Sequence, residues 1–200
     1  MTDIKRDFPI WIGKNYNSGG RFGAKILVIG ESTYSESGED TSQYNILIPE
    51  DHIAGYRDAF RTKLARVFLN TDKETREDIS EFWHSVAFFN FVSSPLDGPR
   101  KAPSNDMWKE NSQFMESIVD DLRPNLIVIL GYRMWASWHR NLSYLLSNGP
   151  KIIGAGREQS LFFGDTTLLY CLRHPSSAFS WRSEHPYLME AINKSIEDMR

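Results

Sequence analysis

The chain has 200 residues, which suits a single α/β domain over residues 1–200 and leaves little room for two. Lys and Arg number 23 against 26 Asp and Glu, so the net charge of −3 excludes a protein that binds nucleic acid through overall positive charge. A single cysteine, Cys171, excludes an internal disulfide and a zinc or iron–sulfur cluster held by several cysteines.

Hydropathy gives no sign of a membrane protein, because no apolar run approaches the roughly 18 residues that a spanning helix needs. The first residues carry charges and lack the apolar stretch of a signal peptide. We therefore expect a cytoplasmic protein without membrane partners, with a monomer favoured. Aromatic residues make up 13% of the chain, and rings of this kind serve either a core or stacking on bases.

Short apolar runs bounded by turn residues predict the strands. In chain order they are residues 25–30, 85–92, 126–131 and 167–172, with a weaker candidate at 151–153. Hydrophobicity in these runs is continuous rather than alternating. This pattern is typical of parallel strands that are covered on both faces.

Helical spacing of apolar residues occurs between and after the predicted strands. The predicted helices are residues 56–69, 106–122, 133–146 and 186–199. Alternating strands and helices predict an α/β fold, as a three-layer α/β/α sandwich with a mainly parallel central sheet of about four to five strands.

Polar residues stand where several of the predicted strands end. Ligands of such sheets bind beyond the carboxyl ends of the strands, so these residues are the candidates for a functional site. The first strand runs into Glu31 and Ser32, and the fourth runs into His174. Asn90 stands inside an aromatic run on the second strand.

Each of these residues has more than one interpretation. His174 is either a hydrogen-bonded histidine in a capped loop or a neutral imidazole that donates to developing negative charge. Asn90 needs partners for its amide, since leaving a buried polar group unpaired costs about 1–3 kcal/mol. Its partner is therefore either another part of the protein or a ligand. Glu31 is a general base, a hydrogen-bond partner of the backbone, or a solvated side chain.

The ordered set of motifs resembles the uracil-DNA glycosylase superfamily. In that family a first strand ends in a Gly-x-x-Pro-Tyr or Gly-x-x-Pro-Gly loop that handles the attacking water. A later strand carries an Asn that reads a pyrimidine edge, and a last strand ends in His-Pro-Ser. Residues 30–34, 88–91 and 174–177 are similar to these segments and occur in the same order. Residues 123–131 also resemble the superfamily's strand that runs from a Pro to a Gly.

This resemblance implies a monofunctional DNA glycosylase that flips a pyrimidine-like base out of DNA and hydrolyses its N-glycosidic bond, leaving an abasic site. Its partner is DNA, and it needs no metal and no cofactor. Glu31 and Ser32 then orient or activate water, His174 stabilises charge on the departing base, and Asn90 reads the base edge. The candidates for the pocket wall and for stacking on the base are Tyr34, Tyr44 and Phe89.

DNA contacts are also implied around the end of the last strand. Phe179, in the segment 176–181, wedges into the space that the flipped base leaves. Phosphate contacts need hydrogen-bond donors rather than a high overall charge. The candidate donors are Arg157, Arg173, Arg182, Ser176 and Ser177. For each arginine the alternative is a place in a solvated loop.

The first motif departs from the family pattern in two places. Ser32 stands where several branches carry Asp or Asn, and Thr33 replaces the Pro of the loop. We therefore expect that the substrate is a modified cytosine of phage DNA rather than plain uracil. The insertion at residues 35–55 borders the expected pocket mouth and suits a bulky base. A role in repair and a role in anti-phage defence both stay open.

Two other functions compete with the glycosylase. One is a module of the same fold that binds DNA or a base without catalysis, which the altered first motif favours. The other is a serine esterase of the Gly-Asp-Ser type, with Ser32 as nucleophile and His174 or His185 as base. That family has an Asp three residues before its His, where this chain has Cys171 and Arg182.

Overall fold

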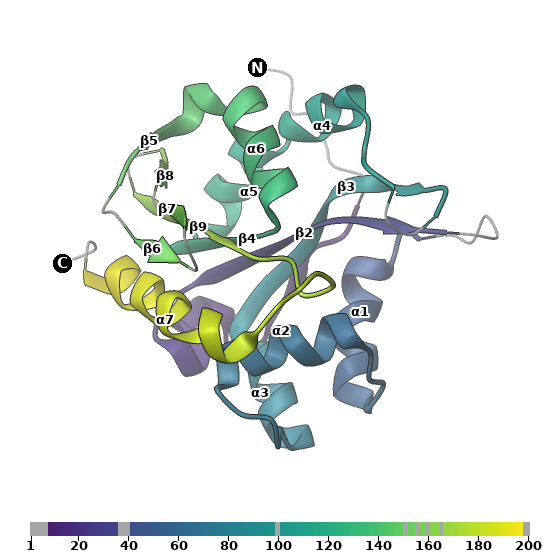
Figure 1. The fold of residues 1–200 in the computed structure, drawn as a ribbon, viewed down its shortest axis with the longest axis vertical. Helices are drawn as coiled ribbons and strands as arrows, with labels where there is room; N and C mark the ends of the chain where they lie inside the picture. The colour runs from purple at the N-terminus through teal and green to yellow at the C-terminus, as the bar shows by residue number, and fades with distance from the viewer. Residues whose placement is uncertain are drawn as a thin grey trace.

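A mixed sheet with helices packed against it forms the molecule, described here from a computed structural model (Figure 1). The structure describes residues 8–35, 41–98, 101–149, 152–154, 157–158, 161–164 and 166–197. Within these residues there are seven α-helices and a seven-stranded sheet with the order β1-β3-β2-β4-β9-β8-β5. The predicted α/β class is confirmed.

Four parallel strands form the centre of the sheet, and they coincide with the four apolar runs. They are β2 (Ile26–Tyr34), β3 (Val86–Leu96), β4 (Leu126–Leu130) and β9 (Thr167–Leu172). β2 lies between β3 and β4, and β9 follows β4. The apolar residues of the four predicted runs are buried, as expected for parallel strands covered on both faces.

Three further strands raise the number in the sheet to seven, where about four to five were expected. β1 (Trp11–Ile12), β5 (Leu146–Asn148) and β8 (Leu161–Phe163) each pair antiparallel with a neighbour. Strands this short carry no hydrophobic period that a sequence reader can detect. β6 (Ile153–Gly154) and β7 (Arg157–Glu158) form a separate two-stranded sheet, so the weak candidate at 151–153 overlaps β6 at one residue.

The helices agree with the predicted ones in part. Their bounds are α1 Tyr44–Ala54, α2 Ala59–Leu69, α3 Arg76–Ser85, α4 Asn105–Ser112, α5 Met115–Leu122, α6 Tyr132–Asn141 and α7 Trp181–Glu197. α2 begins later than predicted because the Asp58 side chain caps it, accepting a hydrogen bond from the Arg61 N–H at 2.7 Å. The predicted helix at 106–122 is two helices, α4 and α5. α6 ends at Asn141, before a 3-10 turn at Ser143–Leu145 that leads into β5.

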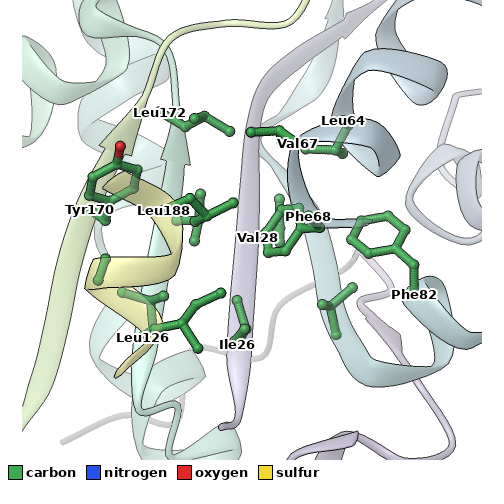
Figure 2. Packing of buried hydrophobic residues seen from close by; sticks show 14 of the residues in the cluster. Ile26, Val28, Leu64, Val67, Phe68, Phe82, Leu126, Tyr170, Leu172 and Leu188 are labelled. Carbon is green, nitrogen blue, oxygen red and sulfur yellow. The ribbon is translucent and has the colours of Figure 1, made fainter. Parts of the chain in front are cut away.

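Two hydrophobic clusters pack the helices against the sheet. One joins β2, β4 and β9 to α2, α3 and α7; in Figure 2 Val28 of β2 lies beside Phe68 of α2, and Leu126 of β4 lies near Leu188 of α7. The other joins the sheet to α4, α5 and α6. Figure 1 shows these last three helices on one side of the sheet and α1, α2, α3 and α7 on the other. Among the described helices, none has the length and apolar character to cross a membrane.

Candidate functional site

The first motif lies on a strand rather than in a loop. β2 pairs with β4 only as far as Ile29, opposite Ile129, and then continues to Tyr34 along β3. β4 stops because the chain turns at Gly131, whose φ of +110° is a conformation that glycine adopts most readily. The chain then enters α6. The end of β2 therefore faces the first turn of α6 where a strand partner would otherwise stand.

A pocket of about 600 Å³ lies at the carboxyl ends of β2, β4 and β9. Seven of the predicted site residues line it, so the structure brings two separate segments of the chain together. These seven are Glu31, Ser32, Tyr34, Arg173, His174, Ser176 and Ser177. Lys101 and Arg133 also line the pocket and were not among the predicted site residues. Tyr34 is 52% exposed.

His174 is fixed as a neutral hydrogen-bond donor. Its Nδ1 accepts a hydrogen bond from the backbone N–H of Ser176 at 3.1 Å, so the proton of the neutral ring is on Nε2. Burial is the main cause that lowers the pKa of His174, with a smaller opposing effect of Glu31. Within the described part of the chain nothing accepts a hydrogen bond from Nε2. That N–H is therefore available to a ligand.

The ring of His174 packs against an aromatic residue of α2. Phe60 of α2 packs against it, with ring centroids 5.7 Å apart. Gly131 also lies beside His174: a Cβ built on it would stand in ordinary van der Waals contact, 3.4 Å from the Cβ of His174, so the φ of +110° rather than a lack of space favours glycine there. The loop after His174 is fixed as well, because the N–H and Oγ of Ser177 donate to the His174 carbonyl at 2.9 and 2.7 Å.

Glu31 forms a two-point ion pair with Arg133. The Nε of Arg133 donates to Oε2 of Glu31 at 2.7 Å, and Nη2 donates to Oε1. This hydrogen bonding is the main cause that raises the pKa of Arg133. The pair exists because β2 extends beside the first turn of α6. Arg133 follows a predicted strand end in the sequence, but its contact with Glu31 depends on that extension.

Arg173 supports the loop that carries His174. Its Nη1 donates to the carbonyl of Ala178 at 2.9 Å, and its Nε lies 3.8 Å from Oε1 of Glu184 on α7. Glu184 is 3% exposed; burial raises its pKa, and Arg173 opposes that shift. Arg173 thus lines the pocket while it holds the loop against α7.

Asn90 and Phe89 are buried and do not line the pocket. The backbone N–H and Nδ2 of Asn90 donate to Oδ1 of Asn45 at 2.8 and 3.1 Å, and Nδ2 of Asn45 donates to the Pro9 carbonyl at 2.9 Å. The amide of Asn90 therefore has a partner within the protein, one of the two alternatives above. Phe89 stacks on Phe8 with centroids 5.8 Å apart. Contacts of Asn90 or Phe89 with a base stay predictions.

Of the remaining predicted DNA contacts, Phe179 and Arg182 lie outside the pocket lining. Phe179 is half-buried against the core. Arg182 pairs with Asp72 and lies 4.3 Å above the Trp181 ring. Arg157 belongs to β7, and its side chain is outside the part of the structure that is described. A contact of any of these three with DNA stays a prediction.

An esterase triad is not assembled in this structure. Ser32 and His174, both described, line the same pocket without a hydrogen bond between them, and the Nδ1 of His174 is already used by Ser176. His185, the alternative base, has its Nδ1 2.7 Å from the Val67 carbonyl oxygen and does not line the pocket. Metal ligands are also not gathered: the described residues contain no group of three or more His, Cys, Asp or Glu that suits an ion.

No protein-family model matches this chain, and no curated protein matches it. Its function is therefore argued from the geometry of the pocket.

Proposed function

We propose that the chain is a DNA glycosylase of the uracil-DNA glycosylase type. It flips a pyrimidine-like base into the pocket and hydrolyses the N-glycosidic bond. The observation that carries the proposal is the fixed Nε2–H of a neutral His174 in the same pocket as the carboxylate of Glu31. Cleavage of an N-glycosidic bond puts negative charge on the base and positive charge on the sugar. A donor and a carboxylate in one pocket suit those two charges.

Each group has a role in the proposed reaction. As the bond between the base and C1′ breaks, its electron pair goes to the base, and the His174 Nε2–H hydrogen-bonds to the oxygen where charge gathers. Glu31 stabilises the positive sugar and accepts a proton from the water whose oxygen bonds to C1′. Ser32 lines the same pocket and helps to hold that water.

The pocket also suits the substrate class. Its volume of about 600 Å³ lies within the ~300–1,000 Å³ typical of small-molecule sites, so it has room for a substituted base. Lys101, Arg133 and Arg173 outnumber Glu31 in the lining and make the site positive in a chain of net charge −3. We extend the proposal to a modified cytosine of phage DNA as substrate, and to a cytoplasmic monomer with the three-layer sandwich of that superfamily.

A screen for base excision tests the proposal. Labelled oligonucleotides that carry uracil, hypoxanthine, thymine mispairs or modified cytosines are incubated with the protein and then treated with alkali. Strand cleavage at one modified pyrimidine, lost in a folded His174→Ala variant, is the expected result. Cleavage at none of these bases would overturn the proposal, and robust cleavage at plain uracil alone would overturn the modified substrate.

One observation favours a second candidate, a module that binds DNA without cutting it. Both carboxylate oxygens of Glu31 are hydrogen-bonded to Arg133, which suits a resting or non-catalytic site. This candidate predicts DNA affinity that falls steeply with salt and no abasic product. The excision screen separates the two functions.

A further inference from the structure

In the Glu31–Arg133 pair, Glu31 lies against the pocket wall and Arg133 lies on its solvent side. The side chain of Glu31 is 11% exposed and that of Arg133 is 48% exposed, so the guanidinium covers the carboxylate. Nη2 of Arg133 also reaches the Lys101 carbonyl at 3.4 Å. A guanidinium has five N–H donors, and these contacts leave some of them for another acceptor. Arg133 therefore has a bound partner and an open side at the same time.

This arrangement conflicts with the role of Glu31 in the proposed reaction. A carboxylate stabilises a positive sugar through its negative charge, and a guanidinium on both of its oxygens cancels that charge. Arg133 beside the sugar would also repel the positive charge that develops there. In the resting pair Glu31 is thus poorly suited to catalysis.

The substrate itself carries the anion that resolves the conflict. Each nucleotide of DNA brings a phosphodiester, and guanidinium groups bind phosphate oxygens at two points as they bind carboxylates. Arg173, the other arginine of the pocket, is already hydrogen-bonded to the Ala178 carbonyl and lies near Glu184. Arg133 is the arginine whose partner is itself a pocket residue.

We propose that Arg133 is a ligand of substrate phosphate, held by Glu31 until DNA binds. A phosphodiester takes over the guanidinium, and Glu31 is left as an unpaired carboxylate that faces the sugar. The exchange draws on the difference between the affinities of Arg133 for the two anions. The inference rests on the proposed function for its choice of DNA, while its test measures binding alone.

Binding of a short fluorescent single-stranded DNA with a non-cleavable abasic analogue tests the exchange. Glu31→Gln removes the competing anion, so affinity rises about two- to fivefold, the range expected for an ion pair with one partner at the surface. Arg133→Met weakens binding and reduces the slope of log affinity against log salt by about 0.7, the value for one phosphate contact on a single strand. The double variant binds like Arg133→Met.

A matched ion pair outside the pocket supplies the control. Arg21 pairs with Glu81 at 2.6 Å, and Arg21 is 37% exposed. Glu81→Gln and Arg21→Met repeat the same chemistry there, and we expect DNA affinity to stay unchanged in both. Unfolding curves of all variants show whether each is native.

The outcomes separate this inference from the proposed function. Unchanged or weaker binding by folded Glu31→Gln, or an unchanged salt slope in folded Arg133→Met, would overturn the role of Arg133. If a variant does not fold, the wild-type protein is tested instead with DNA in which one phosphate at a time is replaced by a neutral methylphosphonate. Replacement of the phosphate that Arg133 binds should lower the salt slope by about 0.7. If no position has this effect, the inference is overturned. The predicted binding changes without excision of any base would overturn the glycosylase and leave Arg133 as a phosphate ligand.

Discussion

Two polar clusters near the carboxyl end of the sheet are built in opposite ways. Asn45 and Asn90 are buried and hydrogen-bond to each other, and Asn45 also bonds to the backbone. His174 and Glu31 border a pocket, and His174 keeps one ring nitrogen for a ligand. Both clusters give a similar signal in the sequence, a polar residue on or at the end of a predicted strand. We assign the proposed function to the cluster that keeps a hydrogen-bond donor which the described protein does not use.

A second cavity shows that size alone does not locate the site. It measures about 870 Å³ and lies at the amino ends of the strands, lined by Lys25, Asp120 and Arg123 among others. Its described lining contains no histidine, and the Lys25 N–H there is already bonded to Asn125 Oδ1 at 2.6 Å. The smaller pocket combines a donor, a carboxylate and excess positive charge, so we assign the chemistry to it.

The largest expected effect is on the pocket cluster of His174 and Glu31. In the proposed reaction His174→Ala removes the donor to the departing base, so the excision rate should fall about 10²–10³-fold, as when one donor to a developing anion is lost. Single-turnover kinetics on the base found by the screen measures it. His139→Ala, an exposed histidine outside the pocket lining, is the matched control. A His174→Ala rate within about twofold of wild type would remove His174 from the mechanism.

His52, a buried histidine outside the pocket, can be compared with His174 through the pH dependence of stability. The Nδ1 of His52 accepts from Trp83 Nε1 at 2.9 Å as His174 accepts from Ser176, but the Nε2 of His52 is buried without a partner in the described structure. Burial, with Arg57 and Arg61, lowers the pKa of His52 to about 4. Between pH 6.5 and 4 the unfolded chain binds this proton before the folded one. Stability conferred by neutral His52 is therefore full above pH 6.5 and lost as pH falls.

Linkage sets the size of this loss at about 3 kcal/mol for a shift from the usual 6.5 to about 4. Urea unfolding at a series of pH values, for wild type and His52→Gln, isolates the contribution as the difference between the two slopes. Parallel slopes would show that His52 titrates normally in the folded protein.

A change in the buried cluster of Asn45 and Asn90 should lower the free energy of unfolding. Asn45→Ala leaves the N–H and Nδ2 of Asn90 and the Pro9 carbonyl without their partner, and each buried group left unpaired costs about 1–3 kcal/mol. We expect a loss of about 2–4 kcal/mol by urea unfolding. A loss under about 0.5 kcal/mol would mean that water replaces the Asn45 contacts. The buried cluster would then not differ from the pocket cluster as described above.

The smallest effect is expected for the ion pair. Glu31→Gln should change the free energy of unfolding by less than about 1 kcal/mol, because the Arg133 side of the pair borders solvent and ion pairs at a surface contribute little. The same unfolding assay measures it. A loss as large as that of Asn45→Ala would mark the pair as structural and contradict its assignment to substrate binding.

The central strands were predictable because each is a continuous apolar run, a pattern that depends on local sequence alone. α1 was not predicted, and Pro49 inside it argues locally against a helix. α3 has a readable start, since Thr75 and Asp78 form a capping box, but its polar residues hide the apolar face. The break between α4 and α5 left no signal in the helical spacing.

The candidate site also has parts that local sequence predicts and parts that it does not. Glu31 and His174 were predictable as polar residues at strand ends, because parallel strands bring their carboxyl ends together. The partner of Glu31 was not, because Arg133 meets it only where β2 continues beyond β4. Asn45 likewise reaches Asn90 from a helix that local sequence did not indicate. Contacts that depend on where strands and helices end lie beyond local patterns.

The state of the His174 ring tests the central claim most directly. Nitrogen-15 NMR of labelled imidazole, assigned with His174→Ala, reports which nitrogen carries the proton and at what pH the ring becomes charged. We predict the Nε2–H tautomer at pH 7 and a ring that charges only below the usual pH range of histidine, since burial lowers its pKa. A proton on Nδ1, or a charged ring at pH 7, would contradict the account.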